Sequence, residues 1–166
     1  MSVTEASRHL DRVLSELAAE YGRLEVVREP REVAPDEYDR LRDRASAFDG
    51  CGGAGAWLHD SSGRVLLVES DEGWREPGAT RQPGDDYLDC ARRAVRDQTG
   101  LDPRLTDVRH VHVRYCRDWT DRQPIPQPFV VFTGDASGRP DGDARWYDEL
   151  PDDLLYELLG ELSLDE

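Results

Sequence analysis

The segment from Trp74 to Leu101, WREPGATRQPGDDYLDCARRAVRDQTGL, constrains the fold more than any other part of the chain. A glycine- and proline-rich loop over residues 73–84 leads into a helix predicted over 86–99, and Gly100 provides its stop. Asp89, Arg93 and Asp97 are four residues apart and share one stripe, a pattern usually made by solvent-exposed ion pairs. The segment therefore predicts a strand–loop–helix unit with charged groups on one helix face.

The flanking segments predict the rest of the fold by their apolar spacing. Apolar residues at three- and four-residue steps predict helices over 2–21 and 35–49, and a last helix beginning at Pro151. Extended segments are expected over 24–27, 54–59, 64–69, 105–116, 129–133 and 145–147, with a turn at Asp60–Gly63. This order of elements predicts a mixed α/β sandwich. The two N-terminal helices could pack on it, pair with another subunit or present a binding surface.

Together the loop and its helix resemble the Nudix box, G-x5-E-x7-R-E-U-x-E-E-x-G-U, where U is a bulky aliphatic residue. Scaffold positions of the box are retained: its arginine is Arg93, its closing glycine Gly100, its aliphatic residues Val95 and Leu101, and the first glycine of the opening doublet Gly78. The carboxylate positions are changed. Ala79 replaces the second glycine, Ala94 the glutamate after the arginine, and the remaining glutamates become Asp85, Asp97 and Gln98.

The resemblance covers residues 52–161 and implies an α/β/α sandwich with a mixed sheet. In this family a two-strand hairpin precedes the box, as residues 54–69 do here, and Trp146–Pro151 resembles the turn into the family's last helix. We therefore divide the chain into an N-terminal helical extension, residues 1–50, and a Nudix-like domain, residues 51–166.

The family's chemistry implies a substrate in which a nucleoside diphosphate is linked to another group. Mg²⁺ or Mn²⁺ would be the cofactor, because such ions take hard oxygen ligands and neutralise a diphosphate. By resemblance the metal ligands are Asp85, Asp97 and Gln98, and the catalytic residues are Asp97, Arg93 and Gln98. The residues expected to bind substrate are Arg75, Arg81 and Gly78, since arginine forks match phosphate oxygens. Candidates for an additional acid from a later loop are Asp118, Asp121, Asp135, Asp141 and Asp143.

The altered box leaves three functions open. Loss of a ligand at Ala94 lowers metal affinity by on the order of tenfold or more, so the chain could be a slow or metal-demanding hydrolase. It could instead bind a nucleotide without cleaving it, as a regulatory module. It could also be a scaffold for contacts made by the N-terminal helices, a homodimer among them.

Composition narrows the partners and the setting. The chain has 36 Asp+Glu against 21 Lys+Arg, all of the latter arginine, and a net charge of −15. Such a chain repels nucleic acid and anionic membranes, so neither is an expected partner. A carboxylate-coated surface suits molar salt, where the Debye length is only ~3 Å, so we expect a halophilic protein. Three cysteines without C-x-x-C spacing, no signal-peptide pattern and no long apolar run indicate a cytoplasmic setting.

A few further side chains carry weaker signals. His110 and His112 are two residues apart on a predicted strand and point to one face, a metal pair or, more commonly, packed residues. Cys90 is predicted to be a small core residue. Trp57 and Trp119 could stack on a base, although burial is the commoner fate of tryptophan.

Overall fold

A mixed sheet organises the part of the chain that the computed structural model describes, residues 2–47, 52–71, 73–82 and 84–151. Its helices are α1 (Ser2–Tyr21), α2 (Pro35–Ala47) and α3 (Tyr87–Thr99). Its strands are β1 (Val26–Glu32), β2 (Gly53–His59), β3 (Val65–Ser70), β4 (Gly73–Arg75), β5 (Gly78–Thr80), β6 (Arg104–Arg117), β7 (Ile125–Asp135) and β8 (Ala144–Tyr147). The predicted α/β fold with a mixed sheet and flanking helices is confirmed.

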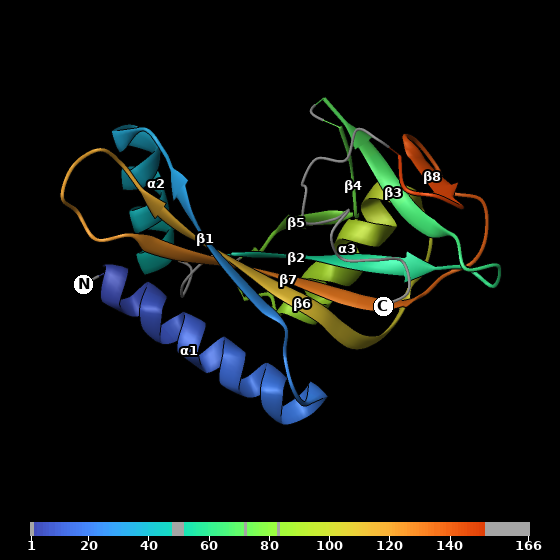
Figure 1. Cartoon of the computed structure of the whole chain (residues 1–166), viewed down its shortest axis with the longest axis horizontal. Helices are drawn as coiled ribbons and strands as arrows, with labels where there is room; N and C mark the ends of the chain where they lie inside the picture. Colours follow the sequence, from blue (N-terminus) through green and yellow to red (C-terminus); the bar gives the residue numbers. More distant parts are fainter. Residues whose placement is uncertain (1, 48–51, 72, 83, 152–166) are drawn as a thin grey trace.

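The sheet has the order β1-β6-β7-β2-β3-β4, with β5 paired to β2 and β8 paired to β3. Two pairings are parallel, β1 with β6 and β2 with β7, and the others are antiparallel. The long β6–β7 hairpin forms the centre of the sheet, and β1 pairs alongside residues 111–117 of β6 (Figure 1). Because β5 pairs with the start of β2, the loop before α3 is attached to the middle of the sheet.

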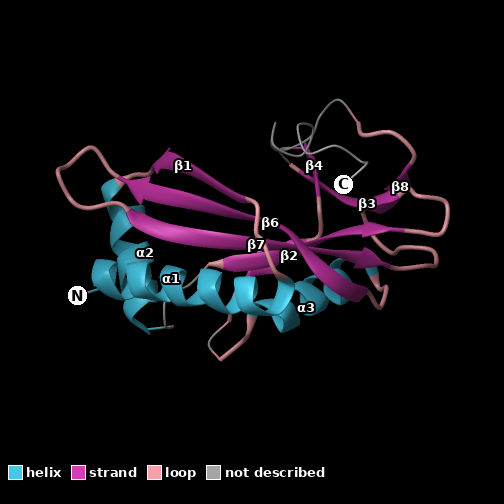
Figure 2. Cartoon of the chain, turned by 60° about the horizontal axis from the view of Figure 1, so that its bottom comes forward, coloured by secondary structure: helices cyan, strands magenta, loops and turns pink. Residues whose placement is uncertain are grey.

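Helices α1 and α3 pack on one face of this sheet (Figure 2). Their apolar stripes meet in one core, to which α1 contributes Leu10, Val13 and Leu17 and α3 contributes Cys90 and Ala91. Side chains alternate along a strand, so Val111, Val113, Val130 and Phe132 of the hairpin enter this core. The intervening residues lie on the opposite face of the sheet, called the far face below. Because the apolar stripe of α1 is buried in this core, α1 packs on the sheet of its own chain. This is the first of the three alternatives given for the N-terminal helices.

The box helix α3 begins and ends where its caps predict. Asp86 is the N-cap, and its side chain accepts a hydrogen bond of 2.7 Å from the backbone N–H of Asp89. Gly100 ends the helix in the left-handed region, at φ 73°, where a side chain is disfavoured. The cysteine on this helix, Cys90, is fully buried, which confirms it as a core residue.

Two expectations for the flanking segments need correction. The extended piece expected over 24–27 is a longer strand, β1, which makes residues 26–32 part of the same sheet as the predicted domain. The turn at Asp60–Gly63 is confirmed, but β2 and β3 pair only at His59 and Val65 before they diverge, because β5 takes the place next to β2. The division of the chain at residue 50 stays a prediction, and the helix predicted from Pro151 lies outside the described residues.

No helix within the described ranges is long and apolar enough to cross a membrane.

Candidate functional site

The side chain of Gln98 is bound to the loop that opens the box. Its Nε2 donates a hydrogen bond of 2.8 Å to the carbonyl of Gly78, and its Oε1 accepts one of 3.3 Å from the N–H of Gly78. A Cβ at Gly78 would lie 2.7 Å from the ring of Phe129, so any other residue here would require this ring to move. Both ends of the Gln98 amide are therefore used to hold β5 against α3.

The pair formed by Asp85 and Arg93 occupies a second part of the box. Arg93 Nη1 lies 2.6 Å from Asp85 Oδ2, and the N–H of Gln82 donates to the same carboxylate at 3.0 Å. Partial burial would raise the pKa of Asp85, but the hydrogen bonds from Gln82 and Arg93 outweigh burial and lower this pKa. The same hydrogen bond raises the pKa of Arg93. The pair is thus charged at neutral pH and holds the loop to the helix.

That Asp85, Asp97 and Gln98 hold Mg²⁺ or Mn²⁺ stays a prediction, and their contacts do not fit it. Asp85 is paired with Arg93, Gln98 is bound to Gly78, and Ala94, which is buried, has no oxygen to offer. Asp97 is exposed on α3 and is the remaining carboxylate of the box. Among the described residues no group of three or more His, Cys, Asp or Glu side chains is arranged to hold a metal ion.

The two arginines expected to bind one substrate lie on opposite faces of the sheet. Arg81 is buried on the helix side, where its guanidinium lies 5.2 Å from the ring centre of Tyr87 and donates to the carbonyl of Asp85 at 3.2 Å. Arg81 also lines a cavity of about 430 Å³ between α1 and the start of α3. Arg75 lies over the ring of Phe129 on the far face, at 5.8 Å from its centre. The two guanidinium groups therefore contribute to different surfaces.

A buried carboxylate, Glu76, was missed by the sequence analysis. The residue is only 1% exposed, its Oε2 has no hydrogen-bond partner among the described residues, and its Oε1 lies 3.7 Å from Arg75 Nη2. Burial raises its pKa, and the charges of Arg75 and Arg109 lower it by less. The signal that could have found it is period-two alternation, which places Glu76 on the same side of the chain as the buried Trp74.

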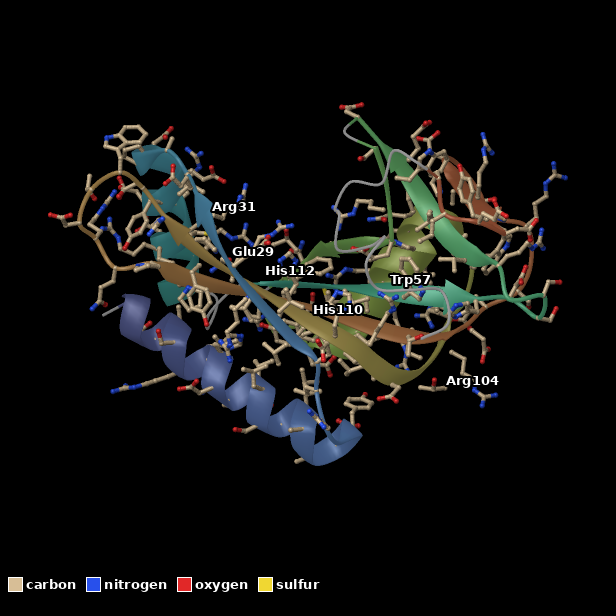
Figure 3. The ribbon with its side chains drawn as sticks, viewed as in Figure 1. Glu29, Arg31, Trp57, Arg104, His110 and His112 are labelled. Carbon is tan, nitrogen blue, oxygen red and sulfur yellow. The ribbon has the colours of Figure 1, made fainter. Side chains whose placement is uncertain are left out.

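The predicted histidine pair also lies on the far face, and both rings are buried (Figure 3). Burial, with the charges of Arg109 and His112, lowers the pKa of His110 to about 3, so its ring is neutral at physiological pH. His112 Nε2 lies 2.9 Å from Glu29 Oε1 of β1, which Figure 3 shows beside it. The packed interpretation of the pair is the one that this geometry supports.

The two tryptophans that could stack on a base differ in environment. Trp57 is fully buried, with the guanidinium of Arg109 4.2 Å from its ring centre. Trp119 is 79% exposed at the tip of the β6–β7 hairpin, so the expectation that it is buried was wrong. In the same tip Asp118, a candidate additional acid, is bound to Thr120 and Arg122. It is therefore occupied in the loop and lies on a different element from the box.

Comparisons with known proteins agree with this arrangement. The sequence model of the family described as NUDIX domain matches residues 51–153. A NUDIX hydrolase structure from Nitrosomonas europaea is similar at a TM-score of 0.53 with 13% identity, covering 68% of this chain and 66% of that one. A MutT NUDIX hydrolase structure from Burkholderia pseudomallei gives 0.52 with 18% identity, covering 81% and 96%. At these identities the likeness concerns the fold. No curated protein matches the sequence.

Proposed function

The chain belongs to the NUDIX domain family, and we propose that it binds a nucleoside diphosphate derivative without hydrolysing it by divalent-metal chemistry. On this proposal the box is degenerate: it keeps the loop–helix scaffold of the family and has lost the carboxylates at Ala94 and Gln98. The proposal takes up the regulatory-module alternative among the three functions left open by the sequence.

The observation that carries the proposal is the double hydrogen bond between Gln98 and Gly78. A glutamate here would place a carboxylate oxygen against the carbonyl oxygen of Gly78, and two acceptors at this separation need a proton or a cation between them. The amide supplies an N–H instead, so the loop closes on the helix without a metal. Ala94 is consistent with this, since it contributes apolar burial where the box has a ligand.

The remaining box residues have supporting roles on this proposal. The ion pair of Asp85 and Arg93 holds the loop at the start of α3. On this proposal Arg93 therefore has a structural role and not the catalytic role that the resemblance implies. Gly78 supplies the close approach of β5 to the sheet rather than a free backbone group, because Gln98 occupies both its N–H and its carbonyl. We assign the binding of the ligand's phosphate oxygens to arginine side chains.

We also propose the setting that the composition predicts. The net charge of −15 and the absence of lysine favour a halophilic protein in a salt-rich, reducing cytoplasm. Neither nucleic acid nor an anionic membrane is proposed as a partner. A homodimer through α1 is not favoured, because the apolar stripe of α1 is already buried in the chain's own core.

The test combines ligand binding with turnover in molar KCl. Calorimetric titration of ADP-ribose and nucleoside di- and triphosphates, with and without Mg²⁺ or Mn²⁺, should find a ligand whose affinity does not need the metal. Phosphate release from the same panel, coupled to a phosphatase, should be absent for the natural chain. Metal-dependent release that Asp97→Ala abolishes would instead establish a hydrolase with a reduced ligand set. Activity that appears only in Ala94→Glu would support a binding module that has lost its chemistry.

A further inference from the structure

Arginine side chains gather on the far face of a protein that is otherwise strongly acidic. Arg31 of β1, Arg75 of β4, and Arg109 and Arg114 of β6 form this group, which we call the arginine face. The carboxylates among them are Glu29, Glu37 and the buried Glu76. Four guanidinium groups against three carboxylates make this part of the surface positive in a chain whose net charge is −15.

A small cavity of about 110 Å³ lies at the edge of the arginine face that is nearest β1. Arg31 and Arg114 line it from the neighbouring parallel strands β1 and β6, and Thr80 lines it from the strand that opens the box. This space is large enough for a phosphoryl group.

Glycines keep the floor of the cavity free of side chains. Gly52 and Gly53 line it, and a Cβ at Gly53 would lie 2.5 Å from the carbonyl oxygen of Ala79. At Gly52 the backbone has φ 100°, and a Cβ would lie 2.5 Å from the carbonyl oxygen of Pro128. Both positions therefore require glycine, because a Cβ would collide with the neighbouring backbone.

The ion pairs that the two lining arginines make with carboxylates are long. Arg31 Nη2 lies 3.5 Å from Glu37 Oε1, and Arg114 Nε lies 3.7 Å from Glu29 Oε1. Both contacts are partly exposed, and a guanidinium carries its N–H donors in a planar fork that matches phosphate oxygens. Partly exposed pairs of this kind contribute little free energy, so an oxyanion with bidentate geometry competes well with them.

We infer that the cavity between Arg31 and Arg114 is a phosphate-binding site, which receives a phosphoryl group of the ligand. This inference rests on the proposed function and specifies where the ligand's phosphates bind. They lie on the far face, between Thr80 of β5 and Arg31 of β1. The strand that supplies Arg31 precedes residues 51–153, which the family model matches, so this part of the site is an addition made by the N-terminal segment. Arg81, in the cavity on the helix side, is not part of this site.

The test measures anion binding by arginine variants of the full chain. Inorganic phosphate, ADP and adenosine are titrated by calorimetry at a fixed KCl concentration that keeps each variant folded, as judged by circular dichroism. Arg31→Gln and Arg114→Gln should each weaken phosphate and ADP by about tenfold or more, and adenosine much less. Arg31→Lys should recover only part of the affinity, because an ammonium lacks the planar fork. The control is Arg28→Gln, which removes the same charge from β1 at a side chain bonded to Tyr115.

The outcomes separate this inference from the proposed function. Phosphate affinity that is unchanged in Arg31→Gln and Arg114→Gln, or reduced equally in Arg28→Gln, would overturn the phosphate site. If the natural chain and these variants then still bind ADP, the proposed function stands without it. Arginine-dependent binding of inorganic phosphate, together with no binding of any nucleotide, would support the site and contradict the proposed function.

Discussion

Replacing Gln98 by glutamate changes one atom of the amide and tests whether the box closes without a metal. The substitution exchanges the Nε2 donor, 2.8 Å from the carbonyl oxygen of Gly78, for a carboxylate oxygen. It removes a hydrogen bond of about 0.5–1.5 kcal/mol and leaves two facing acceptors, which costs about 1–3 kcal/mol more. We expect the free energy of unfolding of Gln98→Glu to fall by roughly 2–4 kcal/mol at pH 7. For a domain of this size that loss lowers the melting temperature by roughly 4–16 °C.

The assay is thermal denaturation followed by circular dichroism, with and without MgCl₂ at ionic strength matched by KCl. A cation between the introduced carboxylate and Gly78 would stabilise the variant in proportion to its binding, whereas the natural chain should not respond to the metal. Acid should also narrow the difference, because a protonated carboxyl can again donate to the carbonyl of Gly78. Gln123→Glu is the control, since it adds the same charge at an exposed loop position.

Two results would refute the reasoning. The first is a metal-free Gln98→Glu variant as stable as the natural chain, which would mean that the amide contact contributes nothing. The second is an equal rise in melting temperature with MgCl₂ for the natural chain and the variant, which would mean that the natural box already binds the metal.

Four further predictions concern stability. Asp85→Asn should cost about 1 kcal/mol at pH 7, because its lowered pKa stabilises the fold above about pH 4. Urea denaturation should show this loss shrinking as the pH falls through the lowered pKa, and a loss that does not shrink in acid would contradict the ion-pair explanation. His110 has a pKa of about 3 in the folded chain, so the unfolded chain binds the proton first and the free energy of unfolding falls as the pH drops below about 6.5. His110→Gln should flatten this pH dependence, and parallel stability curves for the variant and the natural chain would contradict the prediction. Leu10→Ala should lower the free energy of unfolding by roughly 2–5 kcal/mol in chemical denaturation, because Leu10 is buried in the core. The control Arg8→Ala, at an exposed position of α1, should change it by less than about 0.5 kcal/mol, and equal effects of the two variants would mean that α1 does not pack on the core. The melting temperature should rise between 0.1 and about 2 M KCl as salt screens the carboxylates, and a flat response would count against the halophilic proposal.

Much of the fold could be predicted because its signals are local. The caps of α3, Asp86 and Gly100, lie next to the helix that they end, and the turn at Asp60–Gly63 closes through its own side chain. Apolar spacing located β6 and β7 to within a few residues, because a strand buried on both faces shows its pattern along the chain itself. The family resemblance followed from the same local segment, since the box is a continuous stretch of sequence.

The candidate site could be predicted only as a set of residues. Gln98 and Gly78 are 20 positions apart, and their contact depends on the pairing of β5 with β2, which no local pattern specifies. The separation of Arg75 from Arg81 has the same origin, because residues 78–80 between them form β5, a strand of the sheet.

The sequence by itself determined the box helix, the acidic composition and the loss of carboxylates at Ala94 and Gln98, but it predicted a loop where the structure has β4 and β5. Only the tertiary structure decided what the remaining polar groups do. It paired Asp85 with Arg93, buried Glu76, and brought Arg31 of the N-terminal strand beside Arg114 at one cavity. The physical reason is that secondary structure depends on neighbours along the chain, whereas a site depends on which strands are adjacent in the sheet and which face each side chain occupies.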